Sequence, residues 1–216
     1  MPVRLRPTAP IAADAVLVGD PGRALMLAQE LLEKPKMSNH ARGLWGYSGK
    51  TPAGTELSVM STGMGGPSAA LVLADLAELG VRRAVRVGTA TALREETAPS
   101  ELVVVSAAHP GAGGADAIAP DAELTAALAG ELGGGAHRGE AASFDTLHPP
   151  GGAPPTPGEV ADMQTAALLR EGAALGVRLA VVLIVAVGAS GERLGDEGEV
   201  EAAKRAGSAA AAILSG

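Results

Sequence analysis

Two arginines occupy positions that would be unfavourable without a partner, and they are the first candidates for chemistry. Arg86 lies in the apolar stretch 84–88 (AVRVG), where burying an unpaired guanidinium would cost several kcal/mol. Arg23 falls in the expected first turn of a helix, where a cation opposes the helix dipole. A bound anion would account for both, because a guanidinium can hold an oxyanion with two hydrogen bonds. The alternatives are a salt bridge for Arg86 and a solvated side chain for Arg23.

Turns rich in glycine accompany these arginines. Residues 16–24 (VLVGDPGRA) are typical of a strand, a tight turn and a helix start, and such a turn offers unpaired backbone N–H groups to an anion. Thr89 follows Gly88 and could donate its hydroxyl and its backbone N–H to the same anion, although capping a turn is the ordinary alternative. A further glycine turn at 63–66 lacks the third glycine of a dinucleotide-binding fingerprint.

Alternating strands and helices would position these turns. Hydrophobic periodicity predicts strands at 15–18, 82–88, 101–107, 136–144 and 179–187, a hairpin of 43–48 with 56–61, and helices at 22–32, 68–79, 121–132, 159–175 and 196–214. We expect loops at 111–120 and 148–158. This pattern predicts one α/β domain over residues 1–216, a three-layer α/β/α fold with a central mixed, mostly parallel twisted sheet. Ligands of such folds bind beyond the carboxyl ends of the strands, where the glycine turns would meet.

Composition excludes several classes of function. The net charge of −7 and the single Trp, Tyr and Phe argue against a nucleic-acid surface. The chain has no cysteine, which excludes disulfides and thiol chemistry and fits a cytoplasmic protein. The longest apolar run, 179–189, is too short to cross a bilayer, and the N-terminus lacks the apolar region of a signal peptide. The four histidines do not fall at metal-ligand spacing, so we expect no metal site.

Four motifs in sequence order resemble those of the nucleoside phosphorylases, the family of the hexameric purine nucleoside and uridine phosphorylases. They are GDPGRA at 19–24, HARGLWGYSG at 40–49, STGMGGPS at 61–68 and VRVGTA at 85–90. The resemblance implies a pentosyltransferase that cleaves the N-glycosidic bond of a nucleoside with inorganic phosphate, giving the free base and ribose 1-phosphate. Phosphate would be a co-substrate, and no cofactor is implied.

The resemblance also implies roles for individual residues. Phosphate would be bound by Gly19, Arg23, Arg42, Arg86 and Thr89, with Arg23 and Arg86 acting in catalysis. In the hexameric family the counterpart of Arg42 reaches into the site of a neighbouring subunit. The chain is therefore expected to form a homo-oligomer built from dimers, such as a hexamer.

The nucleoside half of the site is expected further along the chain. By resemblance, ribose and base would meet Met64, Phe144, His148, Met163 and Gln164. Residues 162–164 (DMQ) stand where the family has Glu-Met-Glu, whose second glutamate holds the ribose hydroxyls. For the methionines, core packing is the ordinary alternative.

Two departures from the family pattern keep a second interpretation open. Gln164 retains an acceptor oxygen but lacks the glutamate's charge. Ala186 and Val187 stand where the purine enzymes have Ser-Asp, and a valine cannot protonate a leaving base. The chain could therefore be a catalytically impaired homologue that binds phosphate, or a phosphorylated sugar or nucleoside, without turnover. A hydrolase of the same fold is a third alternative, although it would have no need of phosphate-binding arginines.

Overall fold

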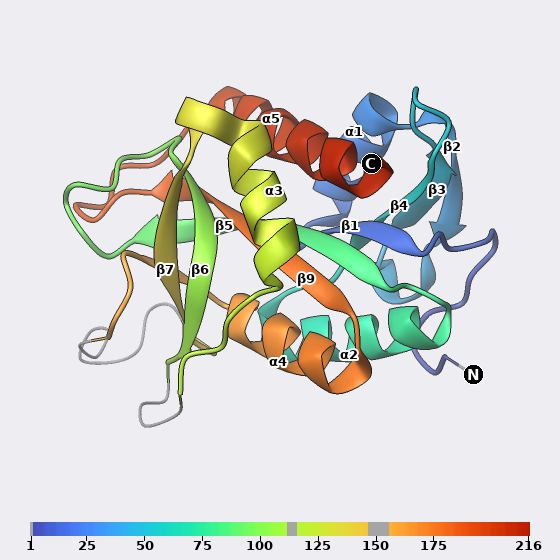
Figure 1. Ribbon diagram of the computed structural model, residues 1–216, viewed down its shortest axis with the longest axis horizontal. Helices are drawn as coiled ribbons and strands as arrows, with labels where there is room; N and C mark the ends of the chain where they lie inside the picture. Colours follow the sequence, from blue (N-terminus) through green and yellow to red (C-terminus); the bar gives the residue numbers. More distant parts are fainter. Residues whose placement is uncertain (1, 112–115, 147–155) are drawn as a thin grey trace.

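The computed structural model describes residues 2–111, 116–146 and 156–216 (Figure 1). In this part of the chain a nine-stranded sheet is combined with five α-helices. The strands are β1 (Asp14–Val18), β2 (Glu33–Asn39), β3 (Gly46–Lys50), β4 (Glu56–Ser61), β5 (Arg83–Ala92), β6 (Leu102–Pro110), β7 (His137–Ser143), β8 (Val160–Asp162) and β9 (Arg178–Val187). The helices are α1 (Pro21–Leu31), α2 (Gly65–Glu78), α3 (Ala122–Leu132), α4 (Thr165–Leu175) and α5 (Asp196–Ser215).

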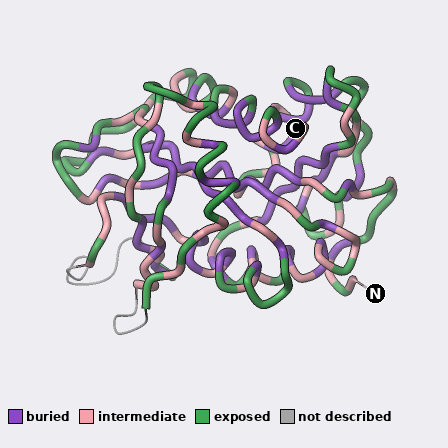
Figure 2. The backbone as a smooth tube through the Cα atoms, viewed as in Figure 1, coloured by how far each residue is buried: buried purple, intermediate pink, exposed green. Residues whose placement is uncertain are grey.

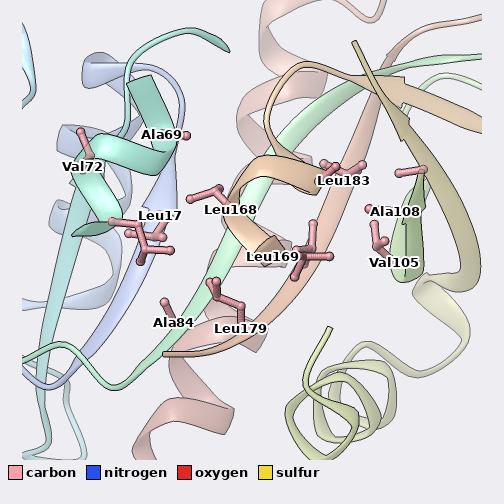
Figure 3. Packing of buried hydrophobic residues seen from close by; sticks show 14 of the residues in the cluster. Leu17, Ala69, Val72, Ala84, Val105, Ala108, Leu168, Leu169, Leu179 and Leu183 are labelled. Carbon is pink, nitrogen blue, oxygen red and sulfur yellow. The ribbon is translucent and has the colours of Figure 1, made fainter. Parts of the chain in front are cut away.

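The helices cover both faces of the sheet and give the predicted three layers. Apolar residues of α1, α3 and α5 pack on one face, and those of α2 and α4 pack on the other. Buried backbone runs through the middle of the molecule, with exposed segments around it (Figure 2). The core is aliphatic: Figure 3 shows Leu168 of α4 on the side of helix α2, and Leu169 on the side of Leu183 and Val105.

Strand β5 changes partners along its length, and this change opens the sheet at one place. Its first half pairs in parallel with β1, and this register ends at Arg86 opposite Leu17. Its end pairs with β8, beginning at Thr91 opposite Ala161. Between these two registers, that edge of β5 has no strand beside it in the described residues. Ligand sites of α/β sheets form where neighbouring strands part in this way.

The sheet also closes on itself around β5. Strand order is β2-β3-β4-β1-β5-β8-β7-β6-β9, and β9 returns to pair in parallel with β5. The five strands β5, β8, β7, β6 and β9 therefore form a closed ring, while β2 forms an open edge. Parallel pairs slightly outnumber antiparallel ones, so the mixed, mostly parallel sheet is confirmed.

Three sequence predictions were wrong in detail. The expected helix 159–175 begins as strand β8, and helix α4 starts only at Thr165. Thr89 was expected to follow a strand that ends at Gly88, but it lies within β5, which pairs with β9 as far as Thr91 and ends at Ala92. Strand β2 was not predicted, because Pro35 and the polar residues around it lack strand periodicity; an edge strand tolerates them.

Residues 2–13, before β1, form no helix or strand, yet they are fixed to helix α2. The buried Asp75 carboxylate accepts hydrogen bonds from the backbone N–H groups of Arg4 and Leu5, at 2.6 and 2.8 Å. The Leu5 side chain is buried in the core beneath. Burial opposes ionisation of Asp75, but its backbone hydrogen bonds outweigh this effect and lower its pKa below the usual value.

Candidate functional site

A cavity of about 500 Å³ lies where β5 changes partners. It is formed by the turn after β1, the loop before α2, the middle of β5 and the junction of β8 with α4. Seven of the residues predicted to bind phosphate or nucleoside line it: Gly19, Arg23, Met64, Arg86, Thr89, Met163 and Gln164. The structure thus brings together side chains that are up to 145 positions apart (Gly19 to Gln164) in the sequence.

Arg86 is buried and bound on two sides. Its Nη2 donates to Asp162 Oδ2 at 2.9 Å, and its Nη1 donates to Gln164 Oε1 at 2.5 Å. The Nε is buried without a hydrogen-bond partner among the described residues. Burial lowers the pKa of Arg86, the Asp162 carboxylate raises it, and the nearby Arg23 lowers it again. The salt bridge considered for Arg86 therefore exists, and the guanidinium also lines the cavity.

Gly88 makes room for this guanidinium. Residues 86 and 88 point to the same face of β5, so the Arg86 side chain folds back over the Gly88 backbone. A Cβ at position 88 would lie 2.6 Å from Arg86 Nη2 and 2.9 Å from a methyl group of Leu183. A residue with any side chain here would push the guanidinium out of its place.

Arg23 differs from expectation in both its backbone and its side chain. The backbone N–H expected to be free for an anion donates to the Asp20 carboxylate, which caps α1, at 2.7 Å. The guanidinium is not free in solvent but paired, because its Nη2 donates to Glu199 Oε2 of helix α5 at 2.8 Å. An anion in this cavity would therefore meet the Arg23 side chain, and its backbone N–H is already used.

Asp162 anchors the junction between β8 and α4. Besides pairing with Arg86, its carboxylate accepts hydrogen bonds from the backbone N–H and the hydroxyl of Thr165, at 3.0 and 2.7 Å. Ser143 at the end of β7 donates to its other oxygen at 2.5 Å. One buried carboxylate thus caps helix α4 and balances the charge of Arg86.

Gln164 is locked through both ends of its amide. Oε1 accepts from Arg86 and from the Thr62 hydroxyl, the latter at 3.0 Å. Nε2 donates to the carbonyls of Gly63 at 2.6 Å and Gly65 at 3.3 Å. Both glycines have positive φ angles, 73° and 80°, so the amide ties down a loop that only glycine adopts readily. Gln164 therefore connects Arg86 to the loop before α2, and its amide hydrogen bonds are made within the protein.

A second cavity of about 460 Å³ adjoins the first across Met163, which lines both. Phe144 lines this second cavity, with its ring over Gly111, and Asp145 and Arg170 add polar groups at its mouth. The structure thus separates the predicted nucleoside residues: Phe144 lies with Met163, whereas Met64 and Gln164 lie in the first cavity. His148 lies outside the described residues.

Arg42 stands apart from the other predicted phosphate ligands. It is exposed, has a positive φ of 59° and lines neither cavity. Val187, at the end of β9, also lies outside the set of residues that line them. Conversely, Glu199 was predicted to have no functional role. It lies among other acidic residues at the start of a helix, and nothing in that pattern indicates that it contacts Arg23.

No group of three or more His, Cys, Asp or Glu side chains in ranges 2–111, 116–146 and 156–216 could hold a metal ion. Within the same ranges, no helix is long and apolar enough to cross a membrane.

Comparisons with known proteins agree with the arrangement of the fold. The family model of the phosphorylase superfamily matches residues 14–216. A DeoD-type purine nucleoside phosphorylase of Clostridium perfringens is 40% identical over 100 residues, which cover 46% of this chain and 42% of that protein. One from Streptococcus suis is 43% identical over 99 residues, covering 45% and 41%. The match thus spans less than half the length of these curated relatives.

A solved structure resembles nearly the whole chain. The purine nucleoside phosphorylase of Toxoplasma gondii, in complex with immucillin-H, superposes with a TM-score of 0.82 at 22% identity. The superposition covers 94% of this chain and 92% of that one. At this identity the likeness concerns the fold.

Proposed function

Because the chain belongs to the phosphorylase superfamily, we propose that it is a nucleoside phosphorylase. It would cleave the N-glycosidic bond of a nucleoside with inorganic phosphate and release the free base and ribose 1-phosphate. Purine nucleosides are the first substrate class to consider, since the curated relatives are named purine nucleoside phosphorylases. Uridine and thymidine are the comparison substrates.

One observation carries this proposal: two guanidinium groups share one cavity. Arg23 and Arg86 both line it, and Arg23 lowers the pKa of Arg86 by repulsion. Each is paired with one carboxylate, of Glu199 and Asp162. Such pairs leave N–H groups of both arginines for a further anion, and a doubly charged phosphate between them would relieve the repulsion.

The proposed chemistry is a displacement at C1′ of the sugar. A phosphate oxygen forms the bond to C1′ while the C1′–N bond breaks and its electron pair leaves with the base, which takes up a proton from water. Arg23 and Arg86 would hold the phosphate, and Thr89 at the open edge of β5 could donate its hydroxyl to it. Positive charge developing on the sugar is stabilised by the bound phosphate, so catalysis would depend on positioning and electrostatics.

The proposal includes an oligomeric state and a cellular location. We propose a homo-oligomer built from dimers, such as a hexamer, in which Arg42 reaches the site of a neighbouring copy. The exposure of Arg42, and of Met64 at 88%, supports this arrangement, because both lie on the surface of the single chain. The proposed substrates are cytoplasmic metabolites, so we place the protein in the cytoplasm.

A direct assay tests the proposal. Purified protein is incubated with inosine, guanosine, adenosine, uridine and thymidine, each with and without phosphate, and the free base is quantified. We expect base only when phosphate is present. Phosphate binding without release of base from any nucleoside would overturn the enzymatic function and favour a homologue that only binds.

A further inference from the structure

We propose that Glu199 is a positioning residue that holds Arg23 in the orientation that binds phosphate. This inference rests on the proposed function, because it assumes that the cavity takes phosphate. It assigns a role to helix α5, which supplies no lining residue to that cavity.

The contact joins two distant parts of the chain at the wall of the cavity. Arg23 stands in the first turn of α1 and Glu199 in the first turn of α5, and the two atoms Nη2 and Oε2 lie 2.8 Å apart. The Arg23 side chain is 16% exposed and that of Glu199 is 30% exposed. A half-shielded pair of this kind is weakened less by solvent than a pair on the open surface.

The pair leaves Arg23 free to bind an anion. A guanidinium carries five N–H donors, and Glu199 takes only one of its nitrogens. The remaining donors stay available to the cavity that Arg23 lines. Glu199 therefore orients the guanidinium without replacing the anion, as the carboxylate of Asp162 does for Arg86.

Holding the side chain in advance favours binding. A long arginine side chain loses rotamer freedom when it binds a ligand, and this cost falls when a second group already fixes it. Glu199 also offsets the positive charge of Arg23 close to Arg86 while the site is empty. Without it, Arg23 would be expected to turn away from Arg86 toward solvent.

The test compares carboxylates of the same helix turn. Glu199→Ala should raise the KM for phosphate, and the Kd for inorganic phosphate measured by calorimetry, about tenfold, the scale of one charge-assisted hydrogen bond. Glu199→Gln should raise them less, because its amide oxygen still accepts a hydrogen bond. The KM for nucleoside should stay within about twofold of wild type. Glu197→Ala is the matched control and should change neither value, since Glu197 is exposed and lies in the same turn.

A double-mutant cycle separates positioning from a general structural effect. In an Arg23→Ala background, Glu199→Ala should have no further effect on phosphate affinity. An equal effect with and without Arg23, or unchanged phosphate affinity in Glu199→Ala, would overturn the inference. If wild-type protein binds phosphate but cleaves no nucleoside, the Kd values still decide the role of Glu199. If wild-type protein binds no phosphate, the proposed function fails and this inference fails with it.

Discussion

At the scale of single residues, the cavity is built around the buried cation Arg86. It needs a carboxylate beside it, an amide acceptor, and a backbone without a side chain beneath it, and Asp162, Gln164 and Gly88 supply these. Asp162 and Gln164 stand at the junction of β8 with α4, which explains why residues so far from Arg86 in sequence determine its position.

Gly88→Ala should therefore displace the Arg86 guanidinium. The new methyl group would overlap Nη2 and a Leu183 methyl, and we expect a loss of about 1–3 kcal/mol of unfolding free energy together with weaker phosphate binding. Chemical denaturation and phosphate titration measure the two effects. Gly130→Ala is the control: its Cβ would meet nothing within 4 Å in helix α3, so it should leave stability equal or slightly higher. Equal behaviour of the two variants would contradict this account.

Gln164→Glu should destabilise the protein at neutral pH, although glutamate is the residue of the family pattern. A carboxylate oxygen would replace the Nε2 that donates to the Gly63 and Gly65 carbonyls, costing about 1–3 kcal/mol. Chemical denaturation at pH 7 measures this loss. A variant as stable as wild type at pH 7 would show that the loop before α2 adapts.

The sequence indicated which residues line the cavity, but it did not indicate which residues they form hydrogen bonds with. Arg23, Arg86 and Thr89 could be predicted because arginine in an apolar strand and glycine beside a strand have few explanations. Glu199 could not be found, because an acidic residue in the first turn of a helix is favourable without any partner. The hydrogen bonds of the Gln164 amide join the start of α4 to β5 and to the start of α2. The distances between these elements cannot be inferred from spacing along the sequence.

At the scale of elements, α2 carries the anchor of the segment before β1. The hydrogen bonds from Arg4 and Leu5 lower the pKa of Asp75, so its folded-state pKa lies below that of the unfolded chain. The stabilisation is complete above the unfolded pKa of about 4 and is lost as the pH falls through the folded value.

Asp75→Asn should thus remove part of this acid dependence. At pH 7 we expect it to lower the unfolding free energy by about 1–2 kcal/mol, because the amide replaces a charged acceptor. Between about pH 4 and 2, wild-type stability should fall more steeply than that of the variant. Urea denaturation across this range is the measurement, and parallel curves would contradict the assignment. Hydrogen exchange at Leu5 gives an independent readout of the released segment.

Elements with strong periodicity were predictable, and those defined by their neighbours were not. Helices α1, α3 and α5 and strand β9 agree with the prediction within two residues at each end. Strand β8 has only three residues and forms because β5 and β7 flank it. The spacing of its apolar residues continues the helical pattern of α4, so the sequence predicted one helix over both elements.

At the scale of the whole molecule, the proposed sharing of active sites between copies can be tested through Arg42. Arg42→Ala and Arg86→Ala should each abolish most activity. When the two variants are co-expressed, about a quarter of the sites should regain both arginines, since random twofold pairing gives half mixed dimers with one intact site each. Phosphorolysis by the purified mixture measures this, with each variant alone as control. No recovery in a mixture shown to contain mixed dimers would contradict the shared site.

The closed ring of strands also has a consequence for solubility. Because β9 returns to β5, strand β2 is the one terminal strand of the sheet in the described residues, and its backbone is only partly paired on the outside, where the Thr8 N–H donates to the Ser38 carbonyl. Unpaired borders template the intermolecular strand pairing that begins amyloid-like growth. Strand β2 carries Lys34, Pro35 and Lys36, and its register with β3 is interrupted between Glu33 and Lys36. Charge, a missing N–H and an irregular register together oppose intermolecular pairing along this terminal strand.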